Sequence, residues 1–383
     1  MIIFGTRPEA IKMAPIISCL KTKAKNIKPI VCVTAQHREM LDQVLNIFNI
    51  MPDYDLNIMR PSQDLFSITA NTLMGLKSIL MKEHPDMVLV QGDTTTAFIA
   101  GLAAYYLKIP VGHVEAGLRT YNKYSPFPEE INRRLLSALV DVHFAPTNWA
   151  KSNLLKEGVP DSKIVVTGNT VVDALLAIKH KQQAESSGKL WKEYFRKSWN
   201  LAVPDKTIDK KLILVTGHRR ENFGEGFRAI CYALKKIALT RKDVVMVYPV
   251  HLNPNVQLPV KEILGGVANI YLMKPLEYEP FIYLMNHTYL ILTDSGGIQE
   301  EAPSLGKPVL VMRDTTERPE GITAGVVKLV GIDKKIIVSE TLKLLDNKKL
   351  YKKMSKTINP YGDGKAAGRI VRVLVKMLGR DRR

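Results

Sequence analysis

Short, continuous runs of apolar residues recur along the whole chain of 383 residues. Strands that are buried on both faces of a parallel sheet have this pattern, whereas half-exposed strands alternate polar and apolar positions. The runs fall into two series. The first series is 2–4, 30–34, 87–91, 111–114, 142–145 and 164–167, and the second is 212–216, 244–250, 269–273, 289–293, 308–312 and 326–330.

Helix-length segments separate many of these runs, for example 15–22, 39–48, 66–82 and 226–240. Repeated strand–helix units predict an α/β fold with doubly wound parallel sheets. Two series predict two Rossmann-like domains that face a cleft, with the boundary within 169–211. Much of that stretch is polar and rich in lysine, although 190–199 has helical character. We therefore expect domains at 1–168 and 169–363, followed by an amphipathic helix from residue 364.

The composition is that of a soluble globular protein, with 46% hydrophobic and 24% charged residues. The three cysteines, Cys19, Cys32 and Cys231, lack metal-ligand spacing, and no run approaches the roughly 20 apolar residues of a membrane span. These features predict a cytoplasmic protein. The net charge is +18, and the last 41 residues contribute thirteen Lys or Arg against three Asp. A solvated basic helix explains this excess as well as a nucleic-acid site does, and no nucleic-acid-binding motif accompanies it.

Charged and polar residues follow several of the predicted strands. In parallel α/β sheets ligands bind beyond the carboxyl ends of the strands, so these residues are the candidate site. Asp93 and Glu115 follow two successive strands, and Glu129 precedes a helix. Clustered carboxylates raise one another's pKa, which allows one to act as an acid and another as a base. The alternative is structural, with Asp93 capping a helix and Glu129 adding charge to a first helical turn.

The second series contains a candidate anion site at Asp294-Ser295-Gly296-Gly297, between a strand and a helix expected at 298–305. Ser295 could cap that helix, and the glycines would let a ligand approach the backbone N–H groups. An ordinary strand–turn–helix with a serine cap is the alternative. Other candidates around a bound diphosphate are His218, as a phosphate contact or proton relay, and three cations. Those cations are Arg7, Lys12 and Arg133. Glu301, one turn beyond the corner, could accept hydrogen bonds from a ribose.

Several of these segments resemble the non-hydrolysing UDP-N-acetylglucosamine 2-epimerases. The resemblance covers nearly the whole chain in order. It is carried by Phe4-Gly5-Thr6-Arg7-Pro8-Glu9-Ala10-Ile11-Lys12-Met13-Ala14-Pro15 and by the segments 91–96, 113–120, 125–133, 215–222 and 293–321.

The resemblance implies a GT-B-like fold, a homodimer and interconversion of UDP-GlcNAc and UDP-ManNAc, with no cofactor and no metal. It implies that the final helix, about 364–383, packs back on the first domain. It assigns acid–base work to Asp93, Glu115 and Glu129, with His218 close to the diphosphate. Phosphate would be held by Arg7, Ser295, Gly296 and Gly297, ribose by Glu301 and uracil by Phe281, with Lys12 and Arg133 near the active site.

Some members of that family bind a second UDP-GlcNAc as an activator. Gln36 and His37 match the pattern for this, whereas Glu39 and Ser62 replace Gln and Arg of some relatives. Alternatives within the fold are an epimerase of a related UDP-sugar, such as a 2,3-diacetamido uronate, and a glycosyltransferase. Outside it, a nucleotide-sugar-binding regulator or a nucleic-acid-binding protein remains open.

Overall fold

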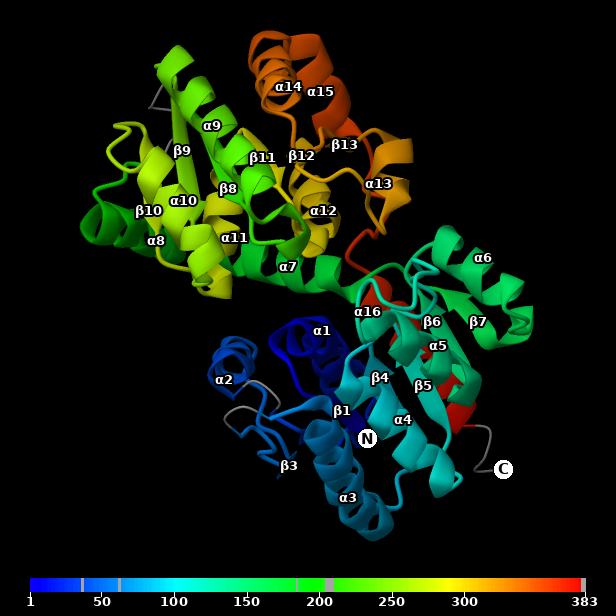
Figure 1. Ribbon diagram of the computed structural model, residues 1–383. Helices are drawn as coiled ribbons and strands as arrows, with labels where there is room; N and C mark the ends of the chain where they lie inside the picture. Colours follow the sequence, from blue (N-terminus) through cyan, green and yellow to red (C-terminus); the bar gives the residue numbers. More distant parts are fainter. Residues whose placement is uncertain (36–37, 61–62, 184, 204–209, 380–383) are drawn as a thin grey trace. The chain divides into compact units, whose positions relative to one another are not determined.

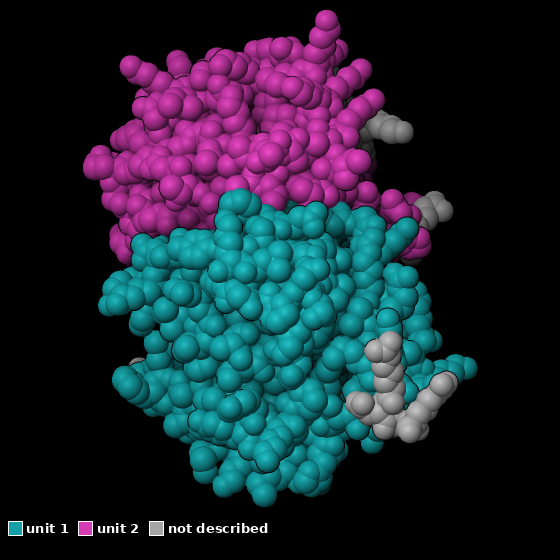
Figure 2. Space-filling model, turned by 90° about the vertical axis from the view of Figure 1, so that its right-hand side faces the viewer, with its two compact units in different colours: residues 1–174, 361–383 teal, residues 175–360 magenta. Residues whose placement is uncertain are grey.

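The computed structural model describes residues 1–35, 38–60, 63–183, 185–203 and 210–379 (Figure 1). The chain divides into two compact units. Unit 1 comprises Met1–Ala174 and Tyr361–Arg383, and unit 2 comprises Leu175–Pro360; they are teal and magenta in Figure 2. The last segment of the chain therefore belongs to the same unit as the first.

Unit 1 is built on a parallel sheet that has seven strands among the described residues, in the order β3-β2-β1-β4-β5-β6-β7. The strands are β1 (Ile2–Phe4), β2 (Val31–Val33), β3 (Tyr54–Asp55), β4 (Val88–Gln91), β5 (Val111–Val114), β6 (Val142–Ala145) and β7 (Ile164–Val166). The helices that accompany them are α1 (Arg7–Lys23), α2 (Arg38–Ile47), α3 (Leu65–Glu83), α4 (Thr95–Tyr106), α5 (Glu129–Leu139), α6 (Asn148–Lys156) and α16 (Ala366–Leu378). Helix α7 (Thr170–Gln182) begins in unit 1 and continues into unit 2.

Unit 2 repeats the design with a parallel sheet in the order β10-β9-β8-β11-β12-β13, six strands within the described ranges. The strands are β8 (Lys211–Thr216), β9 (Val244–Pro249), β10 (Ile270–Met273), β11 (Leu290–Thr293), β12 (Val309–Val311) and β13 (Val327–Leu329). The helices are α8 (Glu185–Trp199), α9 (Glu225–Thr240), α10 (Pro254–Leu264), α11 (Tyr278–His287), α12 (Gly296–Glu301), α13 (Pro319–Ala324), α14 (Lys334–Asp346) and α15 (Lys348–Lys356). The predicted α/β class with two doubly wound parallel sheets is confirmed.

Each of the twelve apolar runs identified in the sequence coincides with a strand, usually shorter by one or two residues, although β8 begins one residue earlier, at Lys211. The pattern missed β3, because a two-residue strand with one exposed position carries no periodicity. It also placed the first helix too late, since α1 begins at Arg7 rather than at residue 15. Thr6 is the N-cap of α1, and Glu9 completes a capping box with it. The segment from Arg7 to Glu9 is therefore the first turn of a helix and not a loop.

The two ends of unit 1 are held together by specific contacts. Helix α16 packs on α1. The carboxylate of Asp173 in α7 accepts hydrogen bonds from the backbone N–H groups of Ala366 and Ala367, at 3.2 and 2.9 Å. An acidic side chain at a helix N-terminus satisfies N–H groups that have no partner within the helix. In unit 2 the lysines of α15 are exposed, as a solvated basic helix requires. Within the described ranges, no helix combines the length and the apolar character needed to cross a membrane.

Candidate active site

Glu115 is the most constrained of the three candidate carboxylates. It follows β5 with a left-handed backbone (φ 66°), and its side chain is 6% exposed. Three side chains donate hydrogen bonds to it: Lys12 from α1 at 2.6 Å, Gln91 at the end of β4 at 3.0 Å, and Asn169 before α7 at 2.7 Å. A carboxylate that accepts hydrogen bonds from these three side chains is held in one orientation, as a catalytic role requires.

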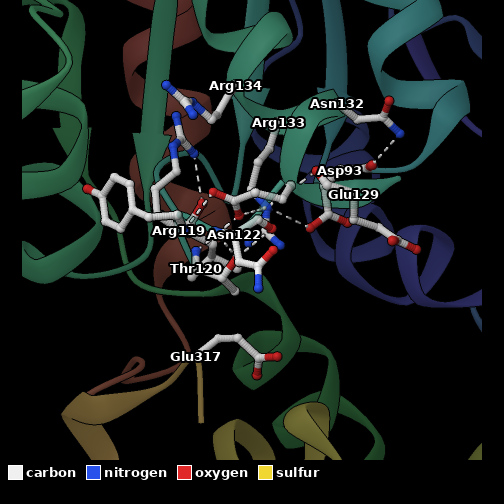
Figure 3. A network of polar contacts seen from close by, with 12 residues as sticks. Asp93, Arg119, Thr120, Asn122, Glu129, Asn132, Arg133, Arg134 and Glu317 are labelled. Carbon is white, nitrogen blue, oxygen red and sulfur yellow. Dashed lines mark hydrogen bonds and ion pairs between the residues drawn. The ribbon is translucent and has the colours of Figure 1, made fainter. Parts of the chain in front are cut away.

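Asp93 lies in the loop between β4 and α4, with its side chain 29% exposed. Arg133 of α5 places its Nε 3.5 Å from the Asp93 carboxylate, and Asn132 Nδ2 donates to the Asp93 carbonyl oxygen at 3.0 Å (Figure 3). Burial raises the pKa of Asp93 above its ordinary value. The nearby positive charges of Arg133 and Lys12 oppose this rise, while the negative charges of Glu115 and Glu129 add to it. The structural alternative for Asp93 is wrong, because the N-cap of α4 is Thr94.

Glu129 is the first residue of α5 and is half-buried. Its carboxylate is close enough to raise the pKa of Asp93 by repulsion. Its backbone oxygen accepts a long hydrogen bond, 3.4 Å, from Arg133 Nε. Asp93, Glu115 and Glu129 therefore lie together in unit 1 with the cations Lys12 and Arg133.

Arg7 occupies the first position of α1 and is half-buried. The neighbouring loop is organised by Glu9, which the sequence analysis did not select. Glu9 is 1% exposed and accepts hydrogen bonds from Gly5 N, Thr6 N and the Thr6 hydroxyl at 2.8–3.0 Å, and from the Thr94 hydroxyl at 2.7 Å. Burial raises its pKa although these hydrogen bonds favour the charged form. The Thr-x-x-Glu capping box was the available sequence signal.

A second buried carboxylate was also missed. Glu130 has no exposed surface, accepts hydrogen bonds from the backbone N–H groups of Thr120 and Tyr121, and pairs with Arg133. It follows Glu129 directly in the sequence. On a helix, adjacent residues point in different directions, so the two neighbours have different environments. Nothing in the local pattern distinguishes the half-buried member of this pair from the buried one.

In unit 2, Asp294 connects two strand ends. It follows β11, is fully buried, and accepts hydrogen bonds from the backbone N–H groups of His218 and Arg219 at 2.8 and 2.9 Å. The ring of His218 lies 3.3 Å from the other Asp294 oxygen through Nδ1 and stacks on His251. Burial lowers the pKa of His218, against the attraction of Asp294. A partly exposed, neutral imidazole with a fixed partner can exchange a proton or a hydrogen bond with a ligand.

The Ser295-Gly296-Gly297 corner begins α12, but not in the way the sequence suggested. Ser295 is the N-cap residue, yet its side chain makes no capping hydrogen bond. The helix already includes Gly296 and Gly297, and it ends at Glu301 before a 3-10 turn, Ala302–Leu305. An added Cβ at Gly296 would meet Arg318 at 2.5 Å, whereas one at Gly297 would meet nothing within 4 Å. The backbone at Gly297 is therefore open to a ligand.

Glu301 is buried and accepts a hydrogen bond from the Tyr278 hydroxyl at 3.0 Å. Phe281 lies one turn along α11 from Tyr278 and is half-buried. Glu301 and Tyr278 are thus in contact, and Tyr278 and Phe281 share one helix. Gln36 and His37, together with Ser62, lie outside the described residues.

His113, in β5, donates a 2.7 Å hydrogen bond through Nε2 to the Gly92 carbonyl oxygen, and its Nδ1 atom has no hydrogen-bond partner among the described residues. Since that carbonyl can only accept, Nε2 of His113 carries the proton. Burial lowers the pKa of His113 to about 3 and that of His143 in β6 to about 4. Within the ranges that the structure describes, no group of three His, Cys, Asp or Glu side chains is arranged to hold a metal ion.

A family model described as UDP-N-acetylglucosamine 2-epimerase matches residues 20–375. The UDP-N-acetylglucosamine 2-epimerase of Escherichia coli K12 is 60% identical, over 97% of this chain and 97% of its own length. The protein of the same name from Campylobacter jejuni is 56% identical, over 98% of this chain and 97% of its own. The crystal structure of the UDP-GlcNAc 2-epimerase from Neisseria meningitidis bound to UDP-GlcNAc has a TM-score of 0.91 and 52% identity, with 98% of this chain and 99% of that one covered.

Proposed function

Because this chain belongs to the UDP-N-acetylglucosamine 2-epimerase family, we propose that it interconverts UDP-GlcNAc and UDP-ManNAc. The observation that carries the proposal is the grouping of Asp93, Glu115 and Glu129 with Lys12 and Arg133 in unit 1. Inversion at C2 of the sugar removes one proton and delivers another. A cluster of carboxylates with different environments supplies both an acid and a base.

The chemistry follows from the substrate. The C2 proton is not next to a carbonyl, so its direct removal is difficult. If the bond between C1 and the diphosphate oxygen breaks as a base takes the C2 proton, the products are 2-acetamidoglucal and UDP. The reverse addition re-forms the C1–O bond while a proton is delivered to the opposite face of C2. Atoms and electrons balance without an oxidant or a reductant, so the reaction needs no redox cofactor.

Within unit 1, two of the three carboxylates take and return the proton. Glu115 is held by Lys12, Gln91 and Asn169, which stabilise its charged form and fix its direction. Asp93 is more easily protonated than an ordinary aspartate, since burial raises its pKa. These differences support a division of acid and base roles. Which step each carboxylate performs depends on the direction of reaction, since the acid of one direction is the base of the other.

The nucleotide would be held by residues at helix starts and by the Asp294 network. Phosphate oxygens would bind Arg7 and the backbone N–H groups at Ser295, Gly296 and Gly297, where a helix N-terminus favours anions. His218 would contact the diphosphate from its position beside Asp294. Glu301 would accept hydrogen bonds from the ribose, and Phe281 would lie by the uracil. The open backbone at Gly297 supports this assignment.

The proposal also covers the compartment, the oligomeric state, the pathway and the activation of the enzyme. The enzyme would act in the cytoplasm as a homodimer and supply ManNAc units for cell-surface polysaccharide. A second UDP-GlcNAc, bound by Gln36 and His37, would activate it. When UDP-GlcNAc is both the substrate and the activator, the initial rate then rises sigmoidally with its concentration, and Gln36→Ala removes the sigmoidal response.

Turnover in heavy water tests the activity and its mechanism together. Incubation with UDP-GlcNAc should place deuterium at C2 of UDP-ManNAc, detected by NMR or by the added mass. UDP-ManNAc formed without deuterium would contradict the elimination mechanism. No sugar turnover, accompanied by DNA binding that weakens steeply with salt, would instead indicate a nucleic-acid-binding protein.

A further inference from the structure

Glu130 is a fully buried carboxylate for which the proposed reaction has no direct use. Its side chain has 0% exposure, and the structure satisfies it from two sides. The backbone N–H groups of Thr120 and Tyr121 donate to its two oxygens, each at 3.0 Å. The Nε atom of Arg133, one turn along α5, lies 3.3 Å from Glu130 Oε2. Burying a carboxylate is unfavourable unless it is paired and hydrogen-bonded, so Glu130 depends on all three partners.

Arg133 lies between two carboxylates. Its Nε atom is 3.3 Å from Glu130 and 3.5 Å from Asp93, and its side chain is only 5% exposed. One guanidinium is therefore shared by the buried Glu130 and by a candidate catalytic aspartate, Asp93, which lies beside Arg133 in Figure 3. The pair with Glu130 is the shorter and the more buried of the two, so the Glu130 charge offsets part of the guanidinium charge that acts on Asp93.

The Glu130 carboxylate also binds the loop at Thr120 and Tyr121 through their backbone N–H groups. Thr120 and Tyr121 precede the segment that leads into α5, and Tyr121 has a left-handed backbone (φ 61°). The Thr120 hydroxyl donates to the Ser125 carbonyl oxygen at 2.6 Å, which closes the loop towards Glu129. Glu130 thus links the loop after β5 to the first turn of α5, where Glu129 lies.

We propose that Glu130 is a positioning residue for the reaction, which offsets part of the Arg133 charge beside Asp93 and holds the 120–121 backbone against the start of α5. This inference rests on the proposed epimerase function. Glu130 touches no reacting atom in it. Its role is to fix the geometry and the charge around Asp93.

Loss of the negative charge of Glu130 should lower the pKa of Asp93. The charged groups that act on Asp93 are Arg133 and Glu129 from α5, Glu115 after β5 and Lys12 from α1. Without the Glu130 carboxylate, Asp93 is the remaining carboxylate within 4 Å of Arg133 among the described residues. The guanidinium then stabilises the charged form of Asp93 more strongly, and the pKa of Asp93 falls. The part of the pH–rate profile in which the rate changes because Asp93 gains or loses its proton is called the Asp93 limb here. This limb therefore moves to lower pH, whether the reaction needs Asp93 protonated or charged.

The test compares Glu130→Gln with Glu130→Asp and with the matched control Glu157→Gln. Glu157 pairs with the buried Arg119 through two hydrogen bonds, 2.8 and 2.7 Å, in the same unit. Its loss should also disturb the chain next to Thr120, but among the described residues the ion pairs of the Arg133 guanidinium are with Asp93 and Glu130 and not with Glu157. Each variant is purified as the full chain, its thermal midpoint is recorded, and kcat and KM for UDP-GlcNAc are measured across pH.

We expect Glu130→Gln to lower kcat roughly 10- to 100-fold and to move the Asp93 limb by about one pH unit to lower pH. Glu130→Asp, which keeps the charge, should restore the limb towards its wild-type position. Glu157→Gln should lower the thermal midpoint without moving the limb.

An unchanged limb in a folded Glu130→Gln variant would overturn the inference, and so would an equal shift in Glu157→Gln. If Glu130→Gln does not fold, the inference rests on Glu130→Asp, which must then show a lower kcat at an unchanged KM; wild-type kinetics in that variant would overturn it.

The proposed function and this inference fail in different ways. Absence of epimerisation by the wild-type chain removes the function itself, before any variant is compared. Normal wild-type turnover with an unmoved limb in Glu130→Gln leaves the function standing and removes only the positioning role of Glu130.

Discussion

The ammonium group of Lys12 lies 2.6 Å from the carboxylate of Glu115, joining α1 to the end of β5. Both side chains are largely buried, with 14% and 6% exposure, so the pair is weakly screened by solvent. Two further donors, Gln91 and Asn169, also donate hydrogen bonds to that carboxylate. The pair is therefore part of the electrostatic setting of the whole carboxylate cluster, and its influence extends to Asp93.

Replacing Lys12 by Met should raise the pKa of Asp93, because the ammonium charge favours the charged form of that aspartate. The Asp93 limb of the pH–rate profile then moves to higher pH, opposite to the change expected for Glu130→Gln. We expect kcat to fall at least 10-fold, since Glu115 also loses its cation. A pH–rate profile of the variant checks this. A limb that stays in place would show that Lys12 does not act on Asp93.

Removing one candidate catalytic carboxylate at a time should reduce turnover by roughly 10²- to 10⁴-fold, the usual contribution of a general acid or base. The variants are Asp93→Asn, Glu115→Gln and Glu129→Gln, each nearly isosteric with the wild-type side chain. Asp161→Asn is the matched control, because Asp161 is an exposed carboxylate, 69% accessible, that pairs with Lys151 in the same unit. Steady-state kinetics and circular dichroism measure activity and folding. A near-wild-type rate in any of the three would remove that residue from the catalytic set.

Gly297→Ala should weaken UDP binding while leaving the fold intact. An added methyl group at Gly297 meets no atom of the protein within 4 Å, and alanine favours a helix over glycine by about 1 kcal/mol. Its methyl group would nevertheless stand where a phosphate approaches the backbone, and we expect at least a tenfold rise in the Kd for UDP. Calorimetric titration measures it. Gly368→Ala in α16 is the control, because its added Cβ also meets open space. Unchanged UDP affinity in Gly297→Ala would remove this corner from the phosphate site.

The free energy of unfolding should fall as the pH drops from about 6.5 towards 4. Burial lowers the pKa of His113 to about 3 and that of His143 to about 4, below the ordinary value of 6.5. In that window the unfolded chain binds protons that the folded chain does not, so acid favours unfolding. Each histidine contributes a slope of up to about 1.4 kcal/mol per pH unit.

The variant His143→Leu checks this pH dependence. It should flatten the fall in stability at acid pH, as followed by chemical denaturation at several pH values. Identical slopes in the variant and the wild type would show that His143 is already accessible to protons in the folded state.

The repeated strands and the order of the elements could be predicted from the sequence, because burial on both faces of a parallel sheet leaves continuous apolar runs. The two-residue β3 could not, and neither could the early start of α1, where the Thr6–Glu9 capping box outweighs the turn-like appearance of Gly5 to Pro8. Local patterns predict a helix or strand well when many of its residues share one environment. They fail where only two or three residues determine that an element forms or where it begins.

The sequence by itself determined that Asp93, Glu115 and Glu129 follow or precede particular elements, since the carboxyl ends of parallel strands share one edge. Only the tertiary structure decided that Glu115 forms the ion pair with Lys12 and that Asp93 and Glu130 both pair with Arg133. It also decided that Glu130, and not its neighbour Glu129, is buried. These pairings join residues up to 103 positions apart. They depend on side-chain direction and on exclusion of water, which no local pattern encodes, and on them the chemistry of the cluster depends.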